Sequence, residues 1–110
     1  MNIQFYAKNL ELTAQIKDYI NEKIGGLDKY EADITECRVD LSKDTHHHKG
    51  KVYRLEVNLK SSYDRNLIRT TVEAENIMSA IDLAKDKLQR QIVKIKERKN
   101  RQARKSYRKI

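Results

Sequence analysis

Basic side chains recur at spacings of three and four residues along the last helix that the sequence predicts. At 100° per residue they fall within an arc of about 80°, about 115° round the helix from its apolar stripe. These residues, called the basic ridge below, are Lys87, Arg90, Lys94, Arg98 and Arg101. A continuous row of cations can touch successive phosphates of a polyanion. The alternative is an outward helix face that is merely solvated, although such a face usually mixes both signs of charge.

The net charge is concentrated at the same end of the chain. Residues 85–110 carry twelve Lys or Arg and two acids, whereas residues 1–84 carry twelve bases and fourteen acids. The formal charge of +8 therefore divides into +10 and −2. Binding phosphates releases condensed counterions, so nucleic acid is the first expected partner. Two alternatives stay open: a solvated tail, and an anionic membrane surface, for which the tail offers only Tyr107 and Ile110 as apolar contacts.

Other groups that could do chemistry are few. His46, His47 and His48 are consecutive, so they do not readily converge on one metal ion, and only Asp44 is at hand to help. We expect a polar loop there and no metal. Cys37 has no partner pattern of a nucleophile and should pack as a small apolar residue. No Gly-rich phosphate loop, G-x-S-x-G, H-E-x-x-H or paired C-x-x-C occurs. We therefore expect no enzyme activity and no cofactor.

Three tyrosines could stack on unpaired bases, as aromatic residues do on open sheets that bind RNA. They are Tyr6, Tyr53 and Tyr63. Of these, only Tyr6 is clearly predicted to point away from the helices. A surface tyrosine on a strand is more often a cross-strand packing residue.

Hydrophobic periodicity predicts the elements that position these groups. Alternation of apolar and polar residues predicts strands at 2–8, 37–42, 53–59 and 68–74. Apolar spacings of three and four predict helices at 13–27, with Thr13 as N-cap, and at 76–95, with Asn76 as N-cap. The segment 61–66 is predicted to be a hairpin turn. The order β-α-β-β-β-α predicts an α+β fold: a four-stranded mixed sheet, its first pair parallel and its later pairs antiparallel, with two helices packed on one face.

A chain of 110 residues with 38% apolar and 36% charged residues suits one thinly cored domain. We expect this domain to span 1–98 and a basic tail or linker to span 99–110. The apolar stripe stops at Ile95, so the helix beyond it either runs into solvent or frays. No signal sequence or membrane span is evident, which predicts a cytoplasmic protein. We expect it to be a monomer when free.

Three sequence segments resemble one family, the ribosome hibernation-promoting factors, which include the protein Y type of inhibitor. The segments are the opening M-N-I-Q-F-Y-A-K-N-L-E-L-T, the helix end L-D-K-Y, and E-N-I-M-S-A-I-D-x-x-x-D-K-L-Q-R-Q-I-x-K in the last helix. The similarity runs from Met1 to about Arg98.

The resemblance implies binding of the small ribosomal subunit and its 16S rRNA, in the mRNA channel over the tRNA sites, with silencing of translation in resting or stressed bacteria. It implies no small-molecule substrate. It carries over Lys87, Arg90 and Lys94 as rRNA contacts of the last helix, and Lys23 and Lys29 of the first. With the neighbouring bases of the last helix, the expected rRNA-binding residues are Lys23, Lys29, Lys85, Lys87, Arg90, Lys94, Arg98 and Arg101.

The chain departs from the family pattern in places. Gly26 stands where relatives commonly have a base, Met78 replaces a frequent aromatic residue, and the tail is basic where short members are acidic. Long members add a second domain that pairs ribosomes, so this chain is either a short type or the N-terminal part of a long one. Two other functions remain open: a transcription-associated regulator that contacts a sigma factor, and a generic double-stranded RNA binder.

Overall fold

The computed structural model describes the backbone of residues 1–29, 34–44, 52–61 and 68–108, and the side chains of these residues as far as Arg98. The elements are β1 (Asn2–Lys8), α1 (Ala14–Lys23), the 3-10 helix η1 (Gly25–Lys29), β2 (Ile34–Lys43), β3 (Tyr53–Ser61), β4 (Ile68–Ala74) and α2 (Ile77–Arg108). The strands form one sheet in the order β1-β2-β3-β4, with β1 and β2 parallel and the other pairs antiparallel. The predicted α+β fold is confirmed.

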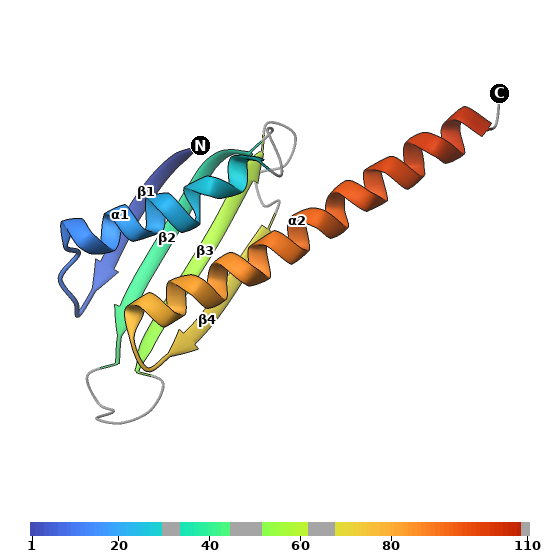
Figure 1. The fold of residues 1–110 in the computed structure, drawn as a ribbon. Coiled ribbons are helices and arrows are strands. Elements are labelled where there is room, and N and C mark those ends of the chain that lie inside the picture. The colour runs from blue at the N-terminus through green and yellow to red at the C-terminus, as the bar shows by residue number, and fades with distance from the viewer. Residues whose placement is uncertain (30–33, 45–51, 62–67, 109–110) are drawn as a thin grey trace.

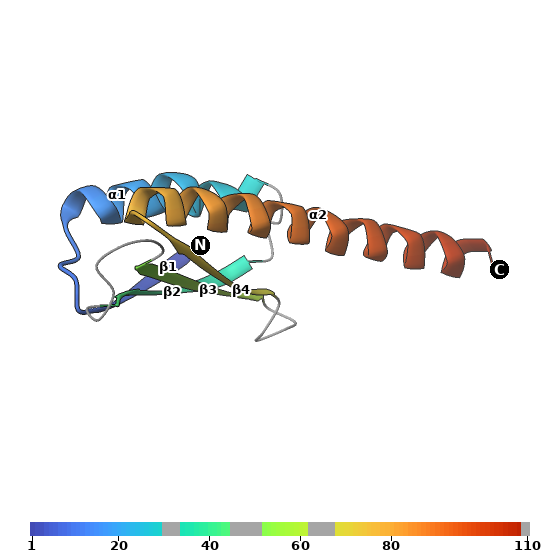
Figure 2. The same cartoon turned by 90° about the horizontal axis from the view of Figure 1, so that it is seen from below.

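The sheet forms one layer, and α1 and α2 both lie on one of its faces (Figures 1 and 2). The strand register explains this arrangement, because it places the apolar residues of neighbouring strands side by side on one face of the sheet. Phe5 pairs with Val39, and Val39 pairs with Val57. Val39 and Val57 are fully buried, while the alternate positions reach solvent on the other face. The helices close the core with Ile20, Ile24, Leu27, Ile81, Leu88 and Ile92.

Both predicted N-caps are present. The Thr13 hydroxyl accepts a hydrogen bond from the Ile16 N–H at 3.2 Å, and the Asn76 side-chain oxygen accepts one from the Ser79 N–H at 2.8 Å. The first helix ends earlier than predicted, at Lys23, because glycine disfavours the α-helix. The chain tightens into η1, which still buries Leu27.

Three strand boundaries also differ from the prediction, and one of them is the end of β2 at Lys43, one residue late. β2 begins at Ile34, three residues early, because a register shift between Ile34 and Glu36 interrupts the alternation that marks a strand. Ser61, which the sequence places in the predicted hairpin turn, is instead the last residue of β3 and pairs with Ile34. The rest of that turn lies outside the described residues.

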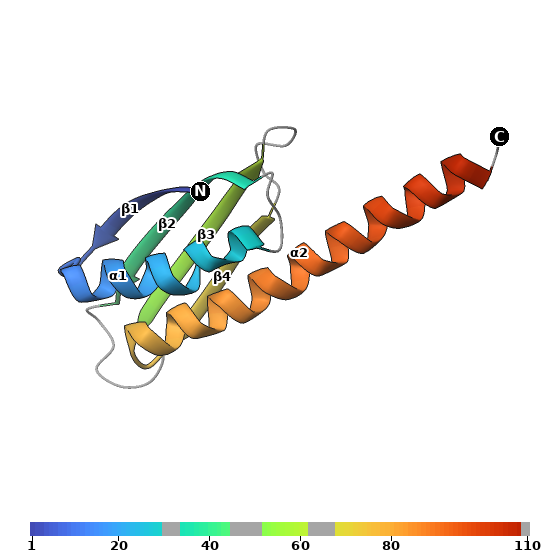
Figure 3. The same ribbon diagram turned by 45° about the horizontal axis from the view of Figure 1, so that its top comes forward.

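The helix α2 is much longer than the strand on which it packs. Its 32 residues give a length of about 48 Å, whereas the seven residues of β4 span about 23 Å. The C-terminal part of α2 therefore projects beyond the sheet (Figure 3), and the molecule measures 61 × 25 × 20 Å. Of the two outcomes expected beyond Ile95, the structure has the continued helix. Within the described residues, no helix is long and apolar enough to cross a membrane.

Cys37 packs in the core as a small apolar residue, as predicted, with no exposed surface. Burial raises the pKa of its thiol to about 12, and the negative charge of Asp28 adds to the shift. The thiolate is the reactive form of cysteine. The native protein should therefore resist thiol reagents at neutral pH.

We expect the stability of the fold to fall above pH 9 because of Cys37. The folded pKa lies above the ordinary 9.0 of an unfolded thiol, so the unfolded chain loses its proton first. The stabilisation that the buried, protonated thiol gives to the fold is fully present below pH 9. It is lost between pH 9 and pH 12, at up to about 1.4 kcal/mol per pH unit. Urea unfolding from pH 8 to 11 measures this slope, with Cys37→Ala as the control that lacks it. Equal slopes for the two proteins would contradict the prediction.

Candidate nucleic-acid interface

The basic ridge is exposed along α2. The side chains of Lys87, Arg90, Lys94 and Arg98 all lie in solvent, while Leu88 and Ile92 between them are buried. The helical period that buries the stripe is thus what keeps the cations on one accessible flank. Arg101 continues the row within α2, but its side chain lies outside those described.

A second basic cluster, which we call the lysine groove, lies between the two helical segments. Lys23, Lys29 and Lys85 line a hollow of about 190 Å³ at the junction of α1, η1 and α2. The first two are separated from Lys85 by more than fifty residues in sequence. The structure therefore brings together three of the predicted residues that no spacing in the sequence connects.

The groove is held in shape by a contact between the helices. The Tyr19 hydroxyl of α1 donates a hydrogen bond to the Asp82 carboxylate of α2 at 2.6 Å. This bond raises the pKa of Tyr19, because the ionised phenolate could no longer donate it and would also lie beside the negative charge of Asp82. The Lys23 ammonium lies 5.6 Å from the centre of the Tyr19 ring. The pair thus fixes α1 to α2 beside the groove.

Gly26 forms part of the groove wall. A Cβ at this position would meet no atom within 4 Å, so a side chain could begin there without a shift of its neighbours.

The two clusters lie on opposite sides of α2 and do not form a single site. Lys85 and Lys94 are nine residues apart, which turns them about 180° round the helix axis. Asp86 lies between the clusters on the exposed back of the helix and pairs with Lys85 at 3.9 Å. The structure therefore places the predicted residues in two separate basic clusters, one on either side of α2.

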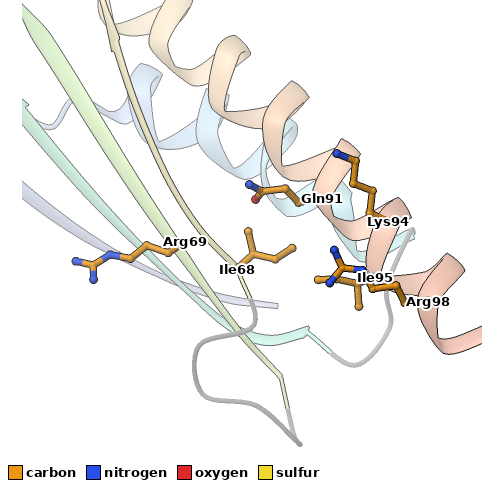
Figure 4. Close-up of a pocket in the computed structure, with 6 residues that line it drawn as sticks. All are labelled: Ile68, Arg69, Gln91, Lys94, Ile95 and Arg98. Atoms are coloured by element: carbon orange, nitrogen blue, oxygen red, sulfur yellow. The ribbon is translucent and has the colours of Figure 1, made fainter. Parts of the chain in front are cut away.

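Sequence reasoning missed a third feature, a hollow of about 260 Å³ between β4 and the ridge. It is lined by Ile68, Arg69, Gln91, Lys94, Ile95 and Arg98 (Figure 4). The one available signal was the position of Gln91, about 60° round the helix from Lys94, between the ridge and the apolar stripe. The position of Gln91 in the sequence does not identify β4 as the strand that faces this residue.

The other face of the sheet does not offer a stacking platform. Tyr6 is 46% exposed there, as predicted, but the Arg38 guanidinium covers its ring at 4.2 Å. Arg38 is held by Asp40 at 3.1 Å. Tyr53 is half-buried with Lys43 beside its ring, and Tyr63 lies outside the described residues.

The described residues contain no group of three or more His, Cys, Asp or Glu that could hold a metal ion. The predicted polar loop with His46, His47 and His48 lies outside them.

Comparison with curated proteins finds relatives named ribosome hibernation promotion factor. The protein of Deinococcus radiodurans is 34% identical over 95 residues, which is 86% of this chain and 49% of the relative. That of Bacillus subtilis is 33% identical over 104 residues, 94% of this chain and 53% of the relative. This chain spans about half the length of the curated relatives it matches.

Solved structures agree with the fold. The N-terminal domain of Thermus thermophilus Protein Y matches with a TM-score of 0.73 and 30% identity, over 86% of this chain and 99% of that domain. A ribosomal subunit interface protein from Coxiella burnetii has a TM-score of 0.74 over 88% of this chain and 99% of its own. At 16% identity, that likeness shows the fold alone.

The family model described as "Sigma 54 modulation protein / S30EA ribosomal protein" matches residues 3–100. This range includes all four strands except Asn2 of β1, the helices α1 and η1, and both basic clusters as far as Arg98. The chain belongs to this family.

Proposed function

We propose that this chain binds the small ribosomal subunit through 16S rRNA, in the channel used by mRNA and tRNA, and silences translation by occupying it in resting or stressed cells. The observation that carries the proposal is the pair of basic clusters on opposite flanks of α2, of which the ridge is exposed and the lysine groove is partly exposed. The relatives are named for ribosome hibernation, and these names indicate the ribosome as the polyanion that the basic clusters bind.

In this function the two clusters contact RNA from different flanks of α2. The ridge offers four described cations on one flank, and the lysine groove offers three on the other. Phosphate contacts of this kind position a protein on RNA without reading sequence. The sheet and helices then form the bulk that keeps mRNA and tRNA out. The proposed role needs no catalysis, cofactor or small-molecule substrate. The proposal includes that the free protein is a monomer and that it acts in the cytoplasm, where ribosomes are.

A regulator that contacts a sigma factor is the alternative, because the family description also includes sigma 54 modulation. Co-sedimentation with purified 30S subunits tests the two, with free duplex RNA as competitor. We expect a 1:1 complex that duplex RNA competes for only weakly. Complete displacement by duplex would favour generic double-stranded RNA binding. Absence from the 30S pellet, together with capture of purified sigma 54, would favour the regulator.

Binding to 30S subunits should weaken steeply with salt. Each phosphate contact contributes about −0.9 to the slope of log K against log salt on duplex DNA and about −0.7 on single strands, and we expect rRNA to fall in this range. Four ridge contacts therefore predict a slope of about −3 or steeper. Affinity measured at four salt concentrations from 50 to 300 mM KCl with constant Mg²⁺ gives this slope. A slope near zero would exclude the electrostatic mechanism.

A further inference from the structure

The hollow beside the ridge combines three kinds of side chain in one place. The half-buried Ile95 and the edge of Ile68, which is 5% exposed, supply apolar surface, Lys94 and Arg98 supply positive charge, and Gln91 supplies an amide. Figure 4 shows Gln91, Lys94 and Arg98 on α2, with Ile68 on the neighbouring strand β4. An apolar surface with a few polar groups that converge on it is typical of a ligand site.

The amide of Gln91 is oriented by the core. The Thr70 hydroxyl, on a side chain that is 4% exposed, donates a hydrogen bond to the Gln91 side-chain oxygen at 2.9 Å. Thr70 is the one hydrogen-bond partner of this side chain among the described residues. Two N–H groups of the amide are therefore left to donate, in a direction that the buried threonine fixes.

The cations of the hollow are Lys94 and Arg98 rather than Arg69. The Arg69 guanidinium donates to the Glu56 carboxylate through two nitrogens, on the helix-free side of the sheet. Figure 4 shows its side chain running away from α2. Lys94 and Arg98 are one helical turn apart, and neither has an ion-pair partner in the described part of the chain. Their charges are available to an anion at the mouth of the hollow.

We propose that this hollow binds one unpaired nucleotide of RNA. Its phosphate lies on Lys94 and Arg98. Its base packs on Ile68 and Ile95 and accepts a hydrogen bond from the Gln91 amide. The proposal rests on the proposed function and names the form of RNA that this part of the ridge recognises.

The chemistry of a nucleotide explains all three features of the lining. Its phosphate needs cations, the faces of its base favour desolvated contact, and every base has an acceptor on its edge. A paired base inside a duplex presents neither face nor pairing edge to a shallow hollow. About 260 Å³ is below the range of about 300 to 1,000 Å³ usual for a free drug-sized ligand, so one unit of a longer chain fits better.

The test compares a labelled single-stranded RNA of ten nucleotides with its duplex, using Gln91→Glu. The new carboxylate can still accept the hydrogen bond from Thr70, so the variant should keep the melting temperature of the wild type. However, the carboxylate cannot donate a hydrogen bond to a base, and its negative charge repels phosphate. Gln89→Glu is the matched control, with the same chemical change two residues away on the other side of α2. We expect Gln91→Glu to lower single-strand affinity about tenfold and duplex affinity no more than Gln89→Glu does.

A direct signal comes from the Gln91 side-chain amide in ¹H–¹⁵N spectra. It should shift on addition of 5′-AMP or 5′-UMP and shift less with inorganic phosphate at the same concentration. Equal shifts with phosphate alone, or equal losses for the two glutamate variants, would overturn the nucleotide site. Sedimentation of the wild-type protein with 30S subunits tests the proposed function separately, because it can succeed while the hollow fails.

Discussion

Replacing Lys87, Arg90 and Lys94 together by alanine should remove binding to the small ribosomal subunit. Each lost phosphate contact removes about 0.9 from the salt exponent, which corresponds to about 0.9 decades of affinity at 0.1 M salt. Three contacts predict a loss of about 100- to 1,000-fold. Sedimentation with 30S subunits, or a titration followed by fluorescence anisotropy, measures this loss.

The same triple variant should fold normally. All three side chains are exposed on α2, and surface substitutions usually change stability by about 0.5 kcal/mol or less. Its melting temperature should therefore stay close to that of the wild type. A variant that unfolds would show that the ridge has a structural role.

A charge-matched control separates position from net charge. Lys8, Lys43 and Arg54 are exposed and cluster around one hollow where β2 ends and β3 begins. Their triple alanine variant has the same net charge as the ridge variant but keeps both α2 clusters. It should bind 30S subunits with an affinity within a few-fold of the wild type. Equal losses in the two variants would mean that binding follows net charge and not the ridge.

Strands and helices could be predicted because each buries one face. The alternation of Leu55, Val57 and Leu59 with polar residues follows from a sheet that is covered on one side and open on the other. Thr13 and Asn76 could be predicted as caps because capping depends on residues within one turn. In contrast, the bulge near Ile34 left no local pattern, so the start of β2 was missed.

The residues of the candidate site also differ in whether local or long-range structure places them. The ridge follows from helical spacing alone, since its members share one helix. Lys23 and Lys29 came from the family resemblance, and only the packing of α1 and η1 against α2 places them beside Lys85. The hydrogen bond between Thr70 and Gln91 likewise joins residues that are distant in sequence. Without the tertiary fold, none of these contacts could be derived.

Leu88→Ala should have the opposite effect to the ridge variants, because it weakens the fold and leaves the cations in place. Leu88 lies between Lys87 and Arg90 but is fully buried in the core beneath α2. Truncation of a buried leucine costs roughly 2 to 5 kcal/mol, through lost burial and the cavity that remains. In a domain of this size, this should lower the melting temperature by about 10 °C or more.

The matched control for this prediction is Leu83→Ala, on the same helix. Leu83 is 46% exposed, so its truncation should change the free energy of unfolding by only about 0.5 kcal/mol. Urea unfolding of the two variants measures the difference. Below its melting temperature, Leu88→Ala should still sediment with 30S subunits, because the folded fraction keeps an intact ridge. If folded Leu88→Ala failed to bind, the buried stripe and the ridge could not be assigned separate roles in stability and in binding.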